Sequence, residues 1–393
     1  MLTQIISVTW INLRSISQRR ASSLVAIVGA AGVVGVLLAM LAMANGFAQT
    51  MQAAGRTDRV IIMRGGSTSE LSSALAGNAI DIIRTTPGIS KSNNRLLFSP
   101  QVVVILDLPL RETGTAANVS LRGVTEGQYA ILDQFAVVAG RRPTPGKREL
   151  IAGRTAAKQF AGLEVGQRVG TGTNSWEVVG IFAEGGSVRE SEVWADAAVV
   201  QDAYRRGNSY SSVLLQLNRA EIFKEFKNTL DNDPRLDVSV ERETRYYAAQ
   251  SGMLRKFIEV IGYSIAVIMA FGAIFAALNT MYSSIASRSS EIATLRALGF
   301  GGTAVLVSVL VEAMLLSLIG GIIGGVIAYL AFNGLMVSTI NFASFSQVAF
   351  AFQLTPALFA VGLVWALVIG FIGGLFPAVR AVRTSVTQAL RPQ

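Results

Sequence analysis

Four long apolar runs constrain this sequence more than any other feature. They cover residues 22–44, 258–284, 303–332 and 356–377. Each is long enough to cross the hydrocarbon core of a bilayer, which takes about 20 residues of α-helix. Charged residues make up only 15% of the chain, whereas a typical soluble domain carries about 25%. The pattern predicts an α-helical membrane protein with four transmembrane helices.

The segment between the first and second runs, residues 45–257, has a different composition. It holds 26 of the 34 Lys and Arg and 22 of the 25 Asp and Glu. Short alternating stretches bounded by Gly and Pro predict strands, and two helices are expected over 71–84 and 220–230. We therefore predict an α+β domain built from both ends of the segment, with a β-rich lobe over about 119–205 inserted between them. The helical pattern of the second run begins near Thr244, so that helix is expected to project past the bilayer.

The short loops predict the orientation in the membrane. Basic residues precede the first run, separate the second from the third, and follow the fourth: Arg14, Arg19, Arg20, Arg288, Arg296, Arg380, Arg383 and Arg391. The loop 333–355 has no charge, and its aromatic, alternating part predicts a hairpin or a re-entrant turn. Since basic short loops stay in the cytoplasm and long domains translocate largely regardless of charge, both termini are expected inside. Residues 1–21 are then an amphipathic helix on the cytoplasmic face, and 378–393 a cytoplasmic tail.

The first run could instead be a cleaved signal peptide, because Ala42-Met43-Ala44 resembles a cleavage site. The run is longer than a typical signal-peptide core of about 7–15 residues, so we expect a retained span. Small residues suited to close helix packing recur in three of the runs: Gly29, Gly32, Gly320, Gly324, Gly370 and Gly374. Pro377 is expected to end the fourth run.

A short polar stretch over 285–302 separates the second and third runs. Ile292, Leu295 and Gly299 recur at i, i+3 and i+7, which places them on one face of a short helix. Arg288 and Glu291 can pair at i, i+3, and Gly299 is placed to stop the helix. An amphipathic helix attached to spans at both ends can transmit force to a protein in the adjacent water. The alternative is a solvated charged loop.

This stretch also carries a family resemblance. The sequence R-S-S-E-I-A-T-L-R-A-L-G, residues 288–299, resembles the coupling helix of the macrolide-exporter (MacB) superfamily of ABC transporter permeases, which includes LolC, LolE and FtsX. Residues 311–321 are similar to the third span of that superfamily. Residues 376–391 are similar to its fourth-span exit and tail, except that Ser385 and Val386 stand where the family usually has Pro.

The resemblance implies a set of partners. A separate cytoplasmic ABC ATPase, which carries ATP and Mg, would bind the coupling helix, and a second permease protomer, identical or related, would complete a dimer. The permease itself would lie in a bacterial inner membrane, in contact with its lipids. A periplasmic adaptor and an outer-membrane exit duct are further candidate partners. The residues expected to couple to the ATPase are Arg288, Glu291, Ile292, Leu295, Arg296, Leu298 and Gly299.

The sequence offers no catalytic machinery of its own. It has no His and no Cys, which excludes Ser-His-Asp chemistry, thiol nucleophiles and His-containing zinc sites. It has no G-x-x-x-x-G-K-[ST] phosphate loop, so the chain is expected to bind no cofactor and to hydrolyse no ATP. Despite the net charge of +9, no basic stripe with interleaved aromatics predicts nucleic-acid binding. The acidic residues Glu190, Glu192 and Asp196 lack a metal-ligand spacing and are expected to form a solvated acidic face.

Glu312 is an ionisable residue inside the third run. A carboxylate in a span costs about 2.5–3.5 kcal/mol on insertion scales, so such a residue is a functional candidate. It lies near the cytoplasmic end of its run. We favour pairing with a basic group of the coupling helix over a role in proton transport.

Two classes of function are therefore open. One is export or extrusion by mechanotransmission, in which ATP hydrolysis by a partner moves the outer domain. The other is an FtsX-like signalling permease that activates a periplasmic partner, with a lipoprotein-releasing LolC/LolE-type subunit as a further alternative. The size of the outer domain, with its inserted lobe, favours export or lipoprotein release over signalling. A membrane-bound enzyme is disfavoured because His, Cys and a recognisable acid pair are absent.

Overall fold

The computed structural model describes residues 20–171, 174–341 and 344–383. The chain divides into two compact units. The helical unit comprises residues 1–46, 256–335 and 352–393, and the sheet unit comprises residues 47–255 and 336–351. The expected amphipathic helix over 1–21 and the tail beyond Arg383 lie outside the described residues, apart from the start of the first helix.

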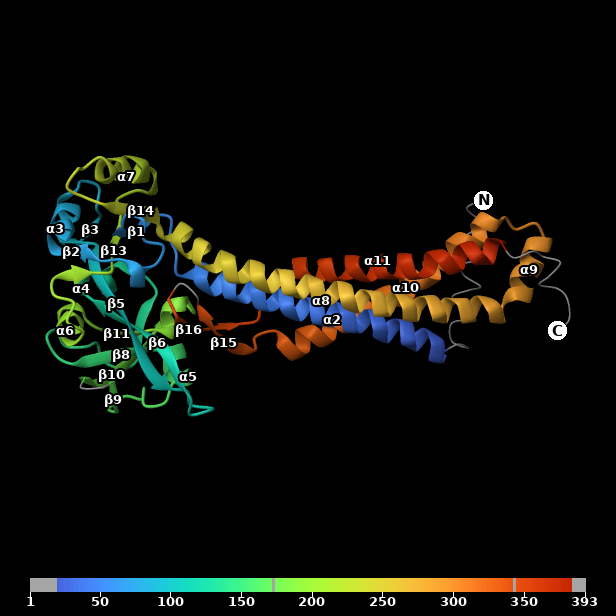
Figure 1. Ribbon diagram of the computed structural model, residues 1–393, viewed down its shortest axis with the longest axis horizontal. Coiled ribbons are helices and arrows are strands. Elements are labelled where there is room, and N and C mark those ends of the chain that lie inside the picture. Colours follow the sequence, from blue (N-terminus) through green and yellow to red (C-terminus); the bar gives the residue numbers. More distant parts are fainter. Residues whose placement is uncertain (1–19, 172–173, 342–343, 384–393) are drawn as a thin grey trace. The chain divides into compact units, whose positions relative to one another are not determined.

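Four long helices account for the four apolar runs (Figure 1). They are α2 (Arg20–Ala53), α8 (Glu243–Ser287), α10 (Gly302–Phe332) and α11 (Pro356–Arg383). Each is long and apolar enough to cross a membrane, which agrees with the predicted α-helical membrane fold. With 45 residues, α8 is about 68 Å long at 1.5 Å per residue. That length exceeds the ~30 Å hydrocarbon core of a bilayer, and the helix begins next to Thr244, as its sequence pattern indicates.

The expected end of the fourth run at Pro377 is wrong, because α11 continues to Arg383. A proline inside a helix removes one hydrogen-bond donor and crowds the preceding turn. Here Pro377 is buried, and the next residue, Ala378, packs with Met281 and Val309 of the neighbouring helices. This packing stabilises the turn that the proline weakens.

Glycines bring α10 into backbone contact with α2. A Cβ atom at Gly320 would lie 2.4 Å from the carbonyl oxygen of Ile27, and one at Gly324 would lie 2.2 Å from that of Ala31. Both distances are far below van der Waals contact, so only glycine fits at these positions. The close packing expected for this pair of glycines is therefore present.

The contact of α11 with α10 is equally tight. A Cβ atom at Gly370 would lie 2.8 Å from Cα of Met314, and one at Gly374 would lie 2.6 Å from Cβ of Ala313. Small residues at such positions let helices approach closely. The glycines of the third and fourth runs thus set the distances between α2, α10 and α11.

Gly29 and Gly32 do not make the close approach expected of them. Cβ atoms there would lie 3.5 Å from Cβ of Ala273 and 3.8 Å from Cε of Met269, which are ordinary van der Waals distances. Instead, the two glycines line an open groove of about 680 Å³ between α2 and α8. The sequence identified the small residues correctly but could not show which of them another helix of this chain covers.

The sheet unit is built on one mixed sheet. From one edge to the other its strands are β14 (Val238–Arg242), β1 (Arg59–Arg64), β13 (Ser212–Gln216), β5 (Phe98–Pro109), β6 (Ala116–Val124), β11 (Val193–Asp196), β8 (Glu149–Gly153), β10 (Asn174–Glu184) and β7 (Phe135–Gly140). A further strand, β9 (Arg168–Thr171), pairs with β10. The short pairs β3 (Lys91–Ser92) with β4 (Arg95–Leu96), and β2 (Leu75–Ala76) with β12 (Ser209–Tyr210), lie apart from it.

The long strand β5 joins the two lobes of this unit. Its first residues, 98–101, pair with β13, and residues 102–109 pair with β6. The α+β lobe is made from both ends of the segment, as expected. The β-rich lobe includes the second half of β5 and therefore begins before the predicted boundary at residue 119.

Helices cover each lobe. In the α+β lobe these are α3 (Gly77–Thr85) and α7 (Phe223–Asp231), the latter preceded by the 3₁₀ turn η4 (Ala220–Ile222). In the β-rich lobe they are α4 (Glu126–Ile131), α5 (Arg154–Gln159), α6 (Ala197–Ala203) and the 3₁₀ turn η3 (Val188–Ser191).

The continuous helix expected over 71–84 is wrong in its first half. The chain forms the 3₁₀ turn η2 (Glu70–Ser72) and the short strand β2 before α3 begins at Gly77. Glu70 is held by an ion pair with Arg122 at 2.7 Å, and Leu75 is buried in the core of the α+β lobe. These tertiary contacts override the local helical pattern.

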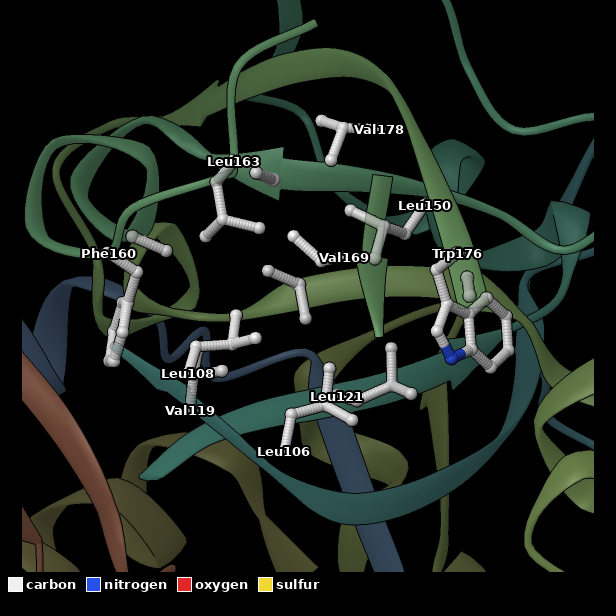
Figure 2. Packing of buried hydrophobic residues seen from close by; sticks show 14 of the residues in the cluster. Leu106, Leu108, Val119, Leu121, Leu150, Phe160, Leu163, Val169, Trp176 and Val178 are labelled. Atoms are coloured by element: carbon white, nitrogen blue, oxygen red, sulfur yellow. The ribbon is translucent and has the colours of Figure 1, made fainter. Parts of the chain in front are cut away.

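The β-rich lobe has its own hydrophobic core (Figure 2). Trp176 of β10 and Phe160, which follows α5, are fully buried among aliphatic side chains. Leu106 of β5 and Leu121 of β6 close the core from the neighbouring strands. This core is separate from the one beneath α3 and α7, so each lobe has its own apolar stabilisation.

The uncharged loop between α10 and α11 forms a hairpin, one of the two structures expected for it. Its strands are β15 (Met336–Asn341) and β16 (Ser346–Ala351). The hairpin belongs to the sheet unit: the Ala349 N–H donates to Ser191 Oγ at 3.2 Å, and the ring of Phe350 packs edge-on against Phe47 with centroids 5.4 Å apart. The sequence did not predict that this loop joins the domain.

Candidate functional site

The polar stretch between α8 and α10 forms a short helix, α9 (Ser289–Ala297). Its end is a Schellman motif: the Phe300 N–H donates to the Leu295 carbonyl, and the Gly299 N–H to the Arg296 carbonyl, each at 3.1 Å. Gly299 has φ +92°, a conformation that glycine adopts without a Cβ penalty. Gly299 therefore stops the helix, as its position in the sequence predicts.

Arg288 ties this helix to the membrane helices. Its side chain is largely buried, with Nε 3.1 Å from Oε2 of Glu291 and Nη1 3.6 Å from Oε2 of Glu312 on α10. Glu312 is only 4% exposed. The structure thus brings the carboxylate of the third run together with a basic group of the coupling stretch. Because charges attract more strongly away from water, the contact holds α9 against α10.

Arg296 makes a second connection. Its Nη1 donates to the carbonyl oxygen of Val382 at 2.9 Å, in the last turn of α11. Carbonyls at a helix C-terminus lack intrahelical partners, and a cation there is favourable. The helix α9 is therefore bonded to α10 through Arg288 and to α11 through Arg296.

The face of α9 that carries Ile292 and Leu295 points inward. Both residues line a small cavity of about 10 Å³ together with residues of α8 and α10, Glu312 among them. Both side chains are half-buried, so this face of α9 packs partly on the helices of the same chain, and a role of Leu295 in coupling to an ATPase stays a prediction.

The outward side of α9 carries Glu291 and Thr294, and Leu298 follows at its C-cap. The Glu291 side chain is 65% exposed and Leu298 is 72% exposed. They are seven residues apart with Thr294 between them, so they follow one side of the helix. This face combines a charged side chain with an exposed apolar one.

The solvated acidic face expected of Glu190, Glu192 and Asp196 is wrong. Glu190 and Glu192 are buried; Glu190 accepts a hydrogen bond from the Gly186 N–H at 2.8 Å, and Glu192 pairs with Arg122 at 2.7 Å. Asp196 caps the start of α6. Among the residues that the structure describes, no cluster of three metal-ligating side chains occurs.

A buried ionic network in the sheet unit is the feature that sequence reasoning missed. Arg122 is buried between Glu70 and Glu192. Burial acts to raise the pKa of Glu70, but Arg122 and a hydrogen bond from Ser212 hold that pKa below its ordinary value. Nothing in the sequence around these residues separates them from exposed charges, because the strand order of the sheet decides their burial.

The structure thus combines four helices long and apolar enough to cross a membrane, an α+β unit with an inserted lobe and the short charged helix α9. Residues 23–232 match the family model "MacB-like periplasmic core domain", and residues 263–386 match "FtsX-like permease C-terminal". The first match covers more than half of the chain, so the chain belongs to the MacB/FtsX-like family of ABC transporter permeases. It is a membrane protein, and the sheet unit is its large extracytoplasmic domain.

Two solved structures are similar to part of the chain. One is the extracellular domain of the noncanonic ABC-type transporter YknZ from Gram-positive bacteria, 19% identical, covering 47% of this chain and 100% of that chain with a TM-score of 0.35. The other is the periplasmic region of MacB from Actinobacillus actinomycetemcomitans, 13% identical, covering 54% of this chain and 96% of that chain with a TM-score of 0.37. A search of curated protein sequences finds no match.

Proposed function

We propose that this chain is the permease subunit of a bacterial inner-membrane ABC transporter that works by mechanotransmission. A separate cytoplasmic ATPase, which binds ATP and Mg, docks on α9 and moves it. The observation that supports this proposal is the division of α9 into two faces. One face is bonded to α10 and α11, and the other presents Glu291 and Leu298 outward.

The contacts of α9 give the movement a physical path. A displacement of α9 pulls on α10 through Arg288 and Glu312, and on α11 through Arg296. It also moves α8, which precedes α9 directly and is continuous from Ser287 to Glu243. Movement of α8 and α2 then drives the extracytoplasmic domain, which expels a substrate outside the membrane without passage through the spans.

A second permease protomer is part of the proposal. The groove between α2 and α8 that Gly29 and Gly32 line is open within this chain; Val28, which also lines it, is 58% exposed, and Phe275 of α8 is 68% exposed. A second copy or a related permease would cover this apolar face. The chain has no Cys, so Val28→Cys gives a clean disulfide cross-linking test in membranes. Cross-linking through Leu330→Cys on α10, with none through Val28→Cys, would place the interface elsewhere.

Two alternatives fit the same fold. In an FtsX-like signalling permease the extracytoplasmic domain activates a partner and moves no substrate, and in a LolC/LolE-type subunit it releases lipoproteins. The two-lobed domain favours export or lipoprotein release. Co-purified partners discriminate among these functions: a periplasmic adaptor with an outer-membrane exit duct indicates efflux, whereas a second, related permease indicates a LolC/LolE-type heterodimer.

Association with the ATPase tests the proposal. Losing a desolvated charged partner in an interface costs about 2–5 kcal/mol, so Glu291→Lys is expected to abolish co-purification of the ATPase. Leu298→Asp is expected to weaken it for lack of an apolar contact. Glu225→Lys makes the same charge change at an exposed position on α7 and serves as the matched control. Equal recovery of the ATPase with all three variants would contradict docking on α9.

A further inference from the structure

The 3₁₀ turn η3 occupies an unusual place in the extracytoplasmic domain. It connects β10 to β11 in the β-rich lobe, and all four of its residues, 188–191, are buried. The carboxylate of its Glu190 accepts hydrogen bonds from the Glu184 and Gly186 N–H groups, both at 2.8 Å. A Cβ atom at Gly153 of β8 would lie 2.2 Å from the Glu190 carbonyl oxygen. The turn is therefore packed tightly into the β-rich lobe.

One side chain of this turn joins the end of α2 to the start of α8. Arg189, 2% exposed, donates from Nη1 to the carbonyl oxygen of Ala54 at 2.8 Å, directly after the end of α2. Its Nη2 pairs with the carboxylate of Glu243, the first residue of α8. A guanidinium is favourable at the C-terminus of one helix, and a carboxylate at the N-terminus of another. Arg189 thus holds the point where α2 enters the domain and the point where α8 leaves it.

The residues that follow α2 also contact the start of α8 at this point. The Arg56 N–H donates to Oε2 of Glu243 at 3.0 Å, and Nη1 of Arg59 lies 3.7 Å from the same oxygen. A Cβ atom at Gly55 would lie 2.9 Å from Cα of Thr244. The Glu243 carboxylate, fully buried, is therefore fixed by two groups that follow α2, on Arg56 and Arg59, and by Arg189.

The same turn contacts the hairpin that links the other two membrane helices. Ser191 Oγ accepts a hydrogen bond from the Ala349 N–H at 3.2 Å, and Ala349 lies in β16 between α10 and α11. Through Arg189 and Ser191, η3 thus contacts the segments that continue into α2, α8, α10 and α11. Each of these contacts lies within the extracytoplasmic domain.

We infer that η3 is the joint through which movement of the membrane helices reaches the β-rich lobe, with Arg189 as its positioning residue. The inference rests on the proposed mechanotransmission. Apolar side chains could hold these segments together without desolvating a charge. Replacing a buried ion pair by well-packed apolar residues is often neutral for stability or stabilising. A planar guanidinium, in contrast, fixes the direction of several partners at once. A joint that must carry a rotation or a pull needs that directional constraint.

The test uses two labels on the full chain in complex with its ATPase in nanodiscs. The chain has no Cys, so spin labels can be attached at Met253→Cys on α8, a position that is 75% exposed, and at Lys158→Cys, exposed on α5 of the β-rich lobe. The distance between them is measured without nucleotide and with a non-hydrolysable ATP analogue. The ATPase rate is measured in parallel.

In the otherwise unaltered protein the distance is expected to stay the same in both states, because the lobe follows α8. In Arg189→Met the distance distribution is expected to broaden or shift with nucleotide, while the permease-stimulated ATPase rate stays at the wild-type level. Arg122→Met is the matched control, since Arg122 is equally buried in an ion-paired cluster but bonds to Glu70 and Glu192 instead of the helix ends. It is expected to behave as the wild type.

Three results would overturn the inference: a wild-type distance that changes with nucleotide, an Arg189→Met distribution identical in both states, or the same broadening in Arg122→Met. If Arg189→Met does not fold, Arg189→Lys replaces it. That variant keeps a cation beside Glu243 but lacks the second guanidinium nitrogen that donates to the Ala54 carbonyl. It is therefore expected to broaden the distance distribution in the same way. A wild-type ATPase rate in Glu291→Lys would count against the proposed function, not against the joint.

Discussion

The contact between Arg288 and Glu312 can be tested by a double-mutant cycle. Removing one partner of a buried ion pair leaves the other charge uncompensated and typically costs about 3–5 kcal/mol. Glu312→Leu leaves Arg288 with the exposed carboxylate of Glu291 at 3.1 Å, and Nη1 of Arg288 lies 3.6 Å from Glu312. The lower end of that range, about 3 kcal/mol, is therefore expected.

The same cycle requires Arg288→Met and the double variant. Replacing both partners removes the uncompensated charge, so the double variant is expected to be more stable than the sum of the two single losses by about 2 kcal/mol. The measurement is the free energy of unfolding in mild detergent, followed by helical signal during titration with a denaturing detergent. If the stability loss of the double variant equals the sum of the two single losses within about 0.5 kcal/mol, the statement that this pair holds α9 to α10 is refuted.

Three further predictions follow from particular contacts. Gly324→Ala, whose Cβ would lie 2.2 Å from the Ala31 carbonyl oxygen, is expected to destabilise the helical unit by about 1–3 kcal/mol, whereas Gly29→Ala is expected to be tolerated. Equal thermal unfolding temperatures of these two variants would contradict the close packing at Gly324. A hydrogen bond from Arg141 lowers the pKa of Glu149 from 4.5 to about 2, so the stabilisation from this pair is present above pH 4.5 and lost as the pH falls toward 2. Between pH 4.5 and 2, the unfolding temperature of Glu149→Gln should therefore fall less steeply with decreasing pH than that of the wild type. Reporter fusions in the β-rich lobe and at the C-terminus should lie on opposite sides of the membrane, and fusions on the same side would refute the four-span topology.

Local patterns of the sequence were sufficient for much of the fold. Hydropathy and length predict the four membrane helices, because a bilayer demands about 20 apolar residues whatever the tertiary contacts. The end of α9 at Gly299 also follows from a local rule, since a left-handed residue after a helix favours glycine. The pairing of Arg288 with Glu291 depends only on their spacing along one helix.

What the sequence could not supply depends on partners distant along the chain. Leu295 has the spacing of an apolar face, but only the position of α8 and α10 shows that the face is partly buried against this chain's own helices. Gly29 and Gly320 look alike in sequence, yet only Gly320 is pressed against another backbone. Arg189 gives no local sign of burial, because its partners Ala54 and Glu243 are remote in sequence.

The central claim is that α9 couples this permease to an ATPase. The most direct measurement is the ATP hydrolysis rate of the reconstituted complex, comparing the wild type with Glu291→Lys and with the control Glu225→Lys. The account predicts that Glu291→Lys loses permease-stimulated hydrolysis while the protein stays folded, with a lower unfolding temperature at most because Arg288 loses one of its two carboxylate partners, and that Glu225→Lys hydrolyses ATP as the wild type does. A wild-type rate of hydrolysis in Glu291→Lys would contradict the account.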